Sequence, residues 1–232
     1  MATKKKITRK ELKEPDEFVS TTTEIYRYVL DNWKYFLSGL IAAVIIVGAG
    51  FIWRAHVIKR ETEAFNLYHS IQLETQKTKG KTETSSKICD AWDKLERKFS
   101  GTPAAIYGLL QKSSCLLAHQ DYKKSGEAIQ KLLSDTKSPA VVRVLSLLLK
   151  GYALEEKKSY KEAEEVFKSL LEDPDNFLRD TVRYHLYICQ LHQGKMEAAK
   201  VTLSGIRIMG DSDFALPIIL VKIEKAKLGI KE

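Results

Sequence analysis

The sequence predicts an all-α protein in which a single N-terminal transmembrane helix is followed by an α-solenoid of helical repeats. Three observations favour this fold class. Lys, Glu, Leu and Ala dominate a chain of 232 residues that contains only five prolines and 9% aromatic residues. Nineteen consecutive residues, 35–53, carry no charge. After them, a pattern of small and large apolar residues recurs at intervals of 36 to 38 residues.

The uncharged segment reads YFLSGLIAAVIIVGAGFIW, from Tyr35 to Trp53, and is bounded by Lys34 and Arg54. Its length suits a helix that crosses about 30 Å of hydrocarbon, and aromatic residues lie near both ends, as in interfacial belts. The alternatives are a buried core helix and a cleaved signal peptide. A signal peptide would need small residues where Arg54 stands. We therefore expect residues 35–53 to span a membrane and to contact lipid.

Two segments precede the span. Residues 20–34 are predicted to form an amphipathic juxtamembrane helix, because apolar residues recur there at helical spacing. The apolar residues at this spacing are Ile25, Tyr28, Val29 and Trp33, and Phe36 at the start of the span continues the pattern. Residues 1–19 are rich in Lys and Glu and contain Pro15, which predicts a disordered basic tail.

The formal net charge of +8 is spread along the chain, since residues 1–34 carry eight Lys/Arg against six Asp/Glu and the remainder thirty against twenty-four. Nucleic-acid binding would need clustered basic residues interleaved with stacking aromatics, which the sequence lacks. The tight basic cluster in the tail suits a cytoplasmic lipid surface. Charges flanking the span barely separate two orientations, although export of the 179 residues after Trp53 is favoured.

One helical repeat is plain in residues 144–176, VLSLLLKGYALEEKKSYKEAEEVFKSLLEDPDN. Small residues such as Gly151 and Ala163 fall where two antiparallel helices would cross closely, and large residues such as Phe167 would fill the space around them. The spacing resembles the tetratricopeptide repeat, a helical hairpin of about 34 residues.

Weaker copies lie thirty-eight residues upstream and thirty-six residues downstream. They align Cys115, Ala153 and Cys189 in one column, which demands a small, buried side chain. The two cysteines are therefore expected to serve packing. The residues predicted to pack between the repeat helices are Gly151, Ala153, Ala163, Phe167, Cys115, Cys189 and Ala199.

Residues 54–212 are thus predicted to form a tetratricopeptide-like domain, and residues 213–232 a helix that caps the stack. The first helix of each repeat lines a concave surface for peptides or partner helices. Its inward residues are unusually apolar, which favours hydrophobic ligands. Alternatively, the terminal helix or the first helical pair fills this groove. The predicted groove residues are Tyr107, Leu110, Leu117, Leu148, Tyr152, Tyr184, Ile188 and Leu191.

Three cysteines are too few for a disulfide framework. Cys115 and Cys189 occupy equivalent positions two repeats apart, too distant for a bridge. Cys89 could pair with Cys115, but we expect three free thiols. His185, Cys189 and His192 share one side of a helix and could offer zinc ligands. Because Cys189 has a packing role and no fourth ligand lies nearby, we predict no metal site.

The sequence contains no P-loop, Rossmann glycine pattern, HExxH or CxxC motif. Its abundant Glu and Lys follow the spacing of a helix surface, as in Glu155, Glu156, Lys157 and Lys158. A catalytic site would need a convergent set of nucleophile, acid or base, and charge-stabilising groups. We therefore expect neither enzymatic activity nor a cofactor.

Three features follow one another along the chain: a charged tail, the apolar segment WKYFLSGLIAAVIIVGAGFIWR, and helical pairs that include AWDKLERKFSGTPAAIYGLLQ. In this order the chain resembles the bacterial ancillary SecYEG translocon subunit family, over about residues 20–210. This resemblance implies a single-pass inner-membrane protein with its N-terminus in the cytoplasm and its repeat domain in the periplasm. It also implies the Sec translocon, a periplasmic chaperone and secretory polypeptides as partners. The longer, Lys-rich tail departs from the family's pattern, which leaves the cytoplasmic contacts open.

Together these features predict a membrane-anchored protein-interaction scaffold. By resemblance, it would be an ancillary subunit of the Sec translocon that recruits a periplasmic chaperone or contacts secretory clients. The alternative is a structural adaptor of another cell-envelope assembly, such as division or wall machinery. The sequence itself does not separate the two.

Overall fold

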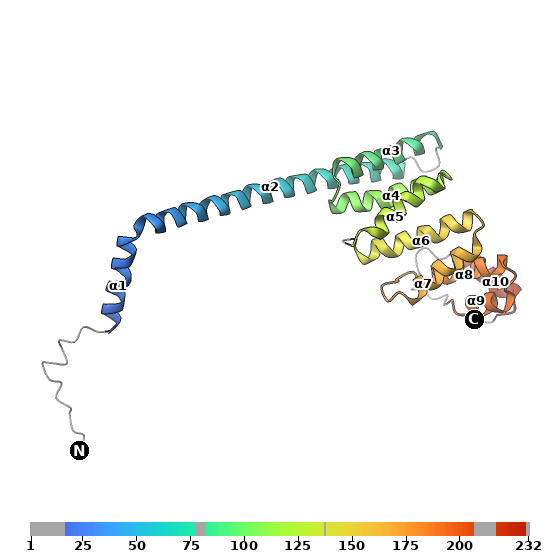
Figure 1. Cartoon of the computed structure of the whole chain (residues 1–232). Coiled ribbons are helices and arrows are strands. Elements are labelled where there is room, and N and C mark those ends of the chain that lie inside the picture. The colour runs from blue at the N-terminus through green and yellow to red at the C-terminus, as the bar shows by residue number, and fades with distance from the viewer. Residues whose placement is uncertain (1–16, 78–81, 137, 207–216, 231–232) are drawn as a thin grey trace, which may run out of the picture. The chain divides into compact units, whose positions relative to one another are not determined.

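The computed structural model describes residues 17–77, 82–136, 138–206 and 217–230. Every regular element in these residues is an α-helix, ten in all, and no strand occurs among them (Figure 1). The predicted all-α class is therefore confirmed. Most of the predicted basic tail, residues 1–19, lies outside the described residues.

Two helices make up the N-terminal part, α1 (Glu17–Asp31) and α2 (Trp33–Lys77). Asn32 lies at the break between them. Its backbone N–H and its side-chain amide both donate to the carbonyl of Tyr28, at 3.1 and 2.9 Å. Helix α1 thus covers most of residues 20–34, where the sequence predicted a juxtamembrane helix, but it begins earlier and ends before Asn32.

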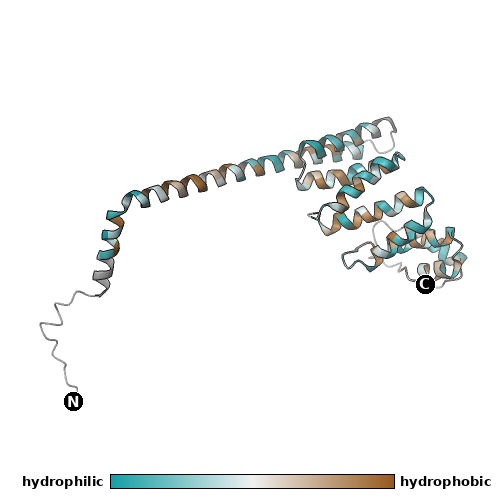
Figure 2. Ribbon diagram, in the orientation of Figure 1, coloured by the Kyte–Doolittle hydropathy of each residue, from teal (hydrophilic) through white to brown (hydrophobic). Residues whose placement is uncertain are grey.

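The large side chains of the apolar part of α2 are exposed. Leu40, Ile46, Phe51 and Trp53 are all exposed, and Figure 2 shows this part of the helix as a run of hydrophobic residues. Within the described part of the chain, α2 is the one helix long and apolar enough to cross a membrane. It continues without a break past the predicted domain boundary at residue 54.

The remaining helices are α3 (Thr82–Lys98), α4 (Pro103–Ala118), α5 (Tyr122–Ser134), α6 (Ala140–Glu156), α7 (Tyr160–Glu172), α8 (Arg179–His192), α9 (Met196–Ser204) and α10 (Ile218–Lys227). The chain divides into two compact units, residues 1–59 and 60–232. In the second unit, α4 packs against α5, α6 against α7 and α8 against α9 (Figure 1). These helical hairpins are the three repeat copies that the sequence predicted.

The three hairpins turn in the same way. Gln120, Lys158 and Gly194 follow the first helix of each pair and have positive φ angles of 60°, 61° and 72°. The Lys158 N–H donates to the carbonyl of Glu155 at 2.8 Å, and equivalent bonds close the other two turns. The turn residues are separated by the same 38 and 36 residues as the repeat copies. The sequence register of the repeats is therefore the structural register.

The turn geometry gives a first prediction. We expect Gly194→Ala to lower the free energy of unfolding by about 1 kcal/mol, because a side chain at a φ of 72° is strained. No atom lies within 4 Å of the Cβ it would gain, so the cost lies in the backbone alone. The measurement is urea unfolding of the full chain in detergent.

Gly126→Ala is the matched control for this turn. Gly126 lies inside α5 with equally open surroundings and no positive φ, so alanine should raise the free energy of unfolding there by about 0.5–1 kcal/mol. Opposite signs at the two glycines are therefore expected. Stabilisation at both positions would contradict the turn geometry.

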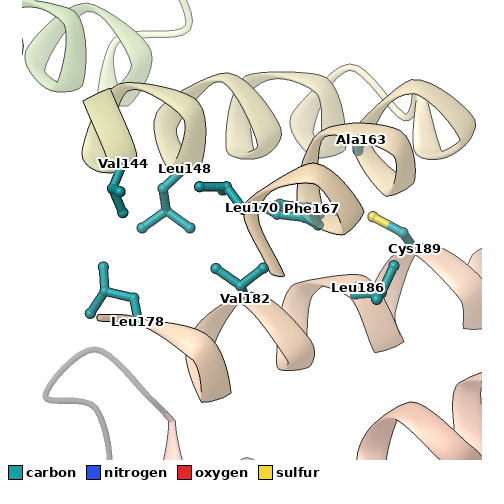
Figure 3. Close-up of a cluster of buried hydrophobic side chains, with 9 residues drawn as sticks. All are labelled: Val144, Leu148, Ala163, Phe167, Leu170, Leu178, Val182, Leu186 and Cys189. Atoms are coloured by element: carbon teal, nitrogen blue, oxygen red, sulfur yellow. The ribbon is translucent and has the colours of Figure 1, made fainter. Parts of the chain in front are cut away.

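The largest core cluster lies between α6, α7 and α8, and Figure 3 shows side chains from all three helices meeting there. Gly151 allows α6 and α7 to approach closely, since a Cβ at this position would lie 2.3 Å from Cε1 of Phe167. Phe167 itself is completely buried. The buried members of the cluster are Val144, Leu148, Ala163, Phe167, Leu170, Leu178, Val182, Leu186 and Cys189.

A second cluster packs the C-terminal part of α2 against α3 and the start of α4. Ala64 and Ile71 of α2 are buried together with Trp92 and Leu95 of α3. The rings of Tyr68 and Trp92 also meet, with centroids 5.2 Å apart. The same helix that carries the uncharged segment thus supplies part of the repeat domain's core.

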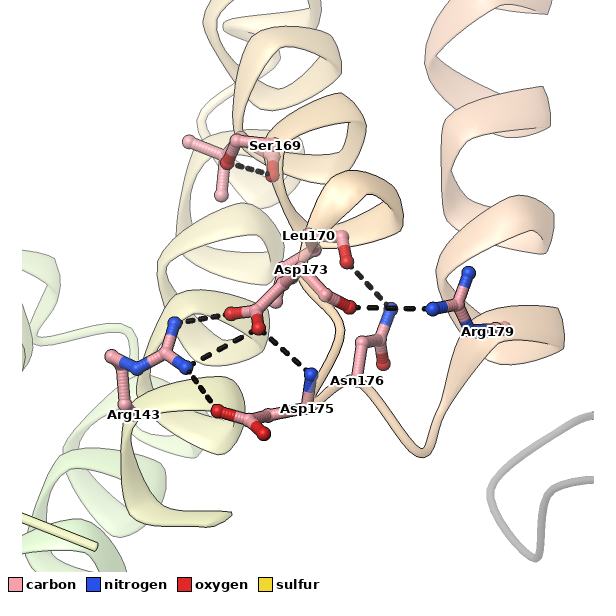
Figure 4. A network of polar contacts seen from close by, with 8 residues as sticks. Arg143, Ser169, Leu170, Asp173, Asp175, Asn176 and Arg179 are labelled. Carbon is pink, nitrogen blue, oxygen red and sulfur yellow. Dashed lines mark hydrogen bonds and ion pairs between the residues drawn. The ribbon is translucent and has the colours of Figure 1, made fainter. Parts of the chain in front are cut away.

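A polar network fixes the loop from α7 to α8, which joins one hairpin to the next (Figure 4). Arg143 of α6 forms ion pairs with Asp173 and, at 2.8 Å, with Asp175. The hydrogen bond from Arg143 lowers the pKa of Asp173. The Asn176 side chain donates to the carbonyl of Leu170 at 2.8 Å. Polar contacts therefore hold the start of α8 against the preceding pair.

Candidate protein-binding surface

The eight predicted groove residues lie on α4, α6 and α8, the first helices of the three hairpins. Tyr107 is the exposed member, with 36% of its surface accessible. Leu110, Leu148 and Tyr184 are buried. The other four, Leu117, Tyr152, Ile188 and Leu191, are partly buried. The structure thus places these residues on the expected helices, but not as an open apolar stripe.

Helix α10 covers the C-terminal part of this face. Tyr184 and Tyr187 of α8 share a buried cluster with Val221 of α10, and Ile188 and Leu191 pack against the same cluster. This arrangement is the alternative in which a terminal helix fills the groove. It explains why apolar residues at the α8 positions need no external ligand.

Two polar contacts anchor α10. The Tyr187 hydroxyl donates to Oε2 of Glu224 at 2.9 Å, and the buried Lys225 Nζ donates to the carbonyl of Ile206 at 2.7 Å. Burial, followed by the hydrogen bond with Glu224, raises the pKa of Tyr187 to about 12. Tyr187 is itself buried, so this hydrogen bond ties a core residue of α8 to α10.

A cluster of aromatic and polar side chains links α6 to α8. His185 Nδ1 lies 2.7 Å from Oε2 of Glu155, and the Cys189 Sγ lies 3.7 Å from Oε1 of the same carboxyl. The ring of Tyr152 lies 4.3 Å from the ring of His185, centroid to centroid. Burial raises the pKa of Tyr152. These contacts join successive repeats across the predicted groove.

The cluster has the composition of a cysteine nucleophile with a histidine base, but its environment opposes that chemistry. Cys189 is completely buried, and burial followed by the charge of Glu155 raises the pKa of its thiol. A nucleophilic cysteine requires a lowered pKa and access to substrate. Cys189 therefore fits the packing role that the sequence predicted for it.

The candidate zinc ligands His185, Cys189 and His192 do not form a ligand group. His192 is exposed and stacks on Tyr160, with ring centroids 4.3 Å apart. Among the described residues, the one group of this kind with ligand atoms close together is Cys89, Cys115 and His119. The sequence did not suggest this group, because Cys89 lies before the first recognised repeat copy.

Cys89 of α3 and Cys115 of α4 form a disulfide, with their Cα atoms 5.7 Å apart. The prediction of three free thiols is therefore wrong, and Cys189 is the free cysteine. Pairing of α3 with α4 brings together two positions that are 26 residues apart in sequence. Cys115 therefore links α4 covalently to α3, and does not serve only as a small packing residue.

A buried carboxylate, Glu164 of α7, joins this helix to the turn between α8 and α9. Its oxygens accept hydrogen bonds from Lys195 Nζ at 2.7 Å, Gln193 Nε2 at 2.8 Å and Lys168 Nζ at 2.7 Å. Burial alone would raise the pKa of Glu164, but these hydrogen bonds outweigh it and lower the pKa to about 2. This role of Glu164 could not be predicted from the sequence, since the residue lies among other Glu and Lys residues of a helix surface.

Glu164→Gln should therefore destabilise the protein at neutral pH by up to about 3 kcal/mol. A carboxyl with a folded pKa of about 2 and an ordinary value of 4.5 adds stability above pH 4.5, which is lost as the pH falls toward 2. The wild-type protein should lose this contribution in acid, whereas the variant should not. Urea unfolding at about pH 7 and about pH 3 measures the difference.

Glu165→Gln provides the control for this prediction, because Glu165 is exposed on the same helix. It should change neither the stability at neutral pH nor its decline in acid. Equal acid sensitivity of the Glu164→Gln variant and the wild type would show that Glu164 does not carry this pH dependence.

The part of the predicted groove that remains open lies on the N-terminal side. Tyr107 and Ser114 of α4 and Glu156 at the end of α6 are exposed. Exposed tyrosine side chains are common at protein–protein contacts, so Tyr107 is the candidate contact residue of this set. Tyr107 is accordingly the one predicted groove residue that is exposed.

Comparison with known proteins identifies a family. A family model described as a tetratricopeptide repeat-like domain matches residues 27–165, which is more than half of the chain. No curated protein and no solved structure matches. The matched residues run from α1 through the apolar part of α2 to α7.

Proposed function

The chain belongs to the tetratricopeptide repeat-like domain family, and on this premise we propose that it is a membrane-anchored scaffold that binds other proteins. Domains of this kind typically act as non-catalytic scaffolds. The observation that carries the proposal is the composition of α2, Trp33–Lys77. One end of this helix exposes an uncharged apolar segment, and the other end is packed into the repeat domain.

The apolar segment supports a membrane anchor on energetic grounds. Exposing apolar surface to water costs roughly 25 cal/mol per Å². The exposed side chains between Tyr35 and Trp53 would be unfavourable in water but favourable in lipid. Tyr35 at one end and Trp53 at the other suit the two interfaces of a bilayer. Membrane lipid is thus the proposed surrounding of this segment.

The disulfide supports an orientation with the repeat domain outside the cytoplasm. Disulfides persist in oxidising compartments such as the bacterial periplasm and are rare in the cytosol. The Cys89–Cys115 bond lies within the repeat domain. The protein would then be a single-pass inner-membrane protein with its N-terminus in the cytoplasm. The basic N-terminal tail fits the same orientation.

The finer proposal is an ancillary subunit of the Sec translocon that recruits a periplasmic chaperone or contacts secretory polypeptides. The order of charged tail, apolar helix and helical hairpins supports it. An anchor of this kind would keep the domain near the exit of the channel, where tethering gives effective concentrations near the millimolar range even for weak contacts. The open surface around Tyr107 of α4 is the proposed contact.

Site-specific photocrosslinking in cells tests this function. A photoreactive amino acid at Tyr107 of the full-length protein should trap Sec subunits, a periplasmic chaperone or secretory polypeptides. The same amino acid at Glu165, exposed on α7, is the control and should trap fewer of them. Capture of only division or wall-assembly proteins at Tyr107 would favour the alternative adaptor function and reject the Sec proposal.

Protease access tests the orientation separately. A tag after Glu232 should become cleavable when the outer membrane is opened, while a tag before Met1 should stay protected until the inner membrane is lysed. The reverse pattern would place the repeat domain in the cytoplasm and would reject this orientation. Release of the full-length protein from membranes by carbonate washing would reject the anchor itself.

A further inference from the structure

Three potential metal ligands converge at one end of the α3–α4 pair. The sulfur atoms of Cys89 and Cys115 and a ring nitrogen of His119 all lie within 4.8 Å of one another. Cys115 and His119 are one helical turn apart, and the His119 N–H donates to the carbonyl of Cys115 at 3.2 Å. The backbone at the end of α4 therefore holds these two ligands on one side, facing Cys89.

The donor set suits zinc. Two thiolates and one imidazole are ligands that Zn²⁺ prefers, and three protein ligands leave a fourth tetrahedral position for water. In such a site the ligand atoms lie roughly 3.5–3.8 Å from one another. Once the sulfur–sulfur bond is opened, the two sulfurs and the nitrogen can reach these separations by small side-chain movements.

The site is also accessible from solvent. A hollow of about 460 Å³ between α3, α4 and α5 is lined by Cys89, Asp90 and Lys112, among others. His119 is exposed, whereas Cys89 is buried at the edge of this hollow. A small reductant can thus approach the Cys89 sulfur from this hollow, and His119 meets solvent directly.

The geometry points to a redox-gated zinc site formed by Cys89, Cys115 and His119, with the disulfide as its closed state. A dithiol reductant supplies two electrons and two protons to the Cys89–Cys115 bond and becomes a disulfide itself. The two thiols that form lose their protons as Zn²⁺ binds, and His119 coordinates as neutral imidazole. In the reverse step a small disulfide accepts two electrons from the two thiolates, takes up two protons from water and leaves as two thiols; the Cys89–Cys115 bond forms again and the metal, now without its sulfur ligands, is released.

Cobalt titration of the full-length protein in detergent tests this site. The protein is reduced with a phosphine, freed of it without oxygen, and titrated with Co²⁺, which reports tetrahedral sulfur ligation by visible and charge-transfer absorption. The reduced protein should bind one Co²⁺ per chain, displaceable by Zn²⁺, and the oxidised protein none. His119→Ala should weaken binding by on the order of a hundredfold.

Two further variants keep the test decisive. His192→Ala, which removes an exposed histidine elsewhere, should leave binding unchanged. His119→Cys should restore binding and strengthen the charge-transfer absorption, because it supplies a third thiolate. The inference is overturned if the reduced protein shows no sulfur-to-cobalt absorption, or if His119→Ala binds Co²⁺ as tightly as the wild type does.

Discussion

Phe167→Ala is expected to lower the free energy of unfolding of the repeat domain by about 3–5 kcal/mol. Phe167 is completely buried in the cluster shared by α6, α7 and α8. Its ring lies against the position where Gly151 lacks a side chain, and also meets the ring of His185, with centroids 5.6 Å apart. Alanine would lose this contact area and leave a cavity between three helices, which the closely packed backbone cannot fill.

The measurement is urea unfolding of the full chain in detergent, with the helical circular dichroism signal as the readout of unfolding. Phe177→Ala is the matched control, because the same residue type is 45% exposed in the loop before α8. It should cost less than about 1 kcal/mol. Comparable losses for the two phenylalanines would show that the three-helix cluster is not the centre of the core.

Removing the disulfide by Cys89→Ala with Cys115→Ala should cost about 3 kcal/mol. A bridge between positions 26 residues apart restricts the unfolded chain, and loss of this restriction stabilises the unfolded state by roughly that amount. The expected result is a lower urea midpoint for the double variant under oxidising conditions. The part of the domain where α3 packs against α4 should account for the loss.

Reduction provides the control. A metal-free phosphine-treated wild type should unfold at nearly the same urea concentration as the double variant, and the reductant should not change the variant further. A wild-type midpoint that does not respond to reduction would show that the bond between Cys89 and Cys115 contributes no stability.

The sequence predicted the repeat domain well because its helices alternate at a fixed spacing. The small residues Gly151 and Ala163 and the large Phe167 have positions in the pattern that match their places in the core. The hairpin turns at Gln120 and Lys158 follow at the same interval. A repeated hairpin can be recognised in this way because each copy packs mainly on its neighbours in sequence.

The candidate surface was predicted less well. Tyr184 and Leu191 have the register of a groove, yet Tyr184 is buried in, and Leu191 packs against, a cluster that includes Val221 of α10. Register determines which face of a helix a residue occupies, but it does not show whether another segment covers that face. The polar contacts of Glu164 were missed for the same reason: its partners Lys195 and Gln193 belong to a different hairpin, and the register of α7 does not show which segment meets it.

The sequence by itself determined the uncharged helix, the number and order of the helical hairpins and the small residues at which they cross. These features depend on spacing along one helix or between adjacent helices, which the chain records directly. The tertiary structure decided that Cys89 bonds to Cys115, that α10 closes one end of the predicted groove and that Glu164 is a buried ionic centre. Each of these depends on which side chains meet across helices, a distance that sequence spacing does not specify.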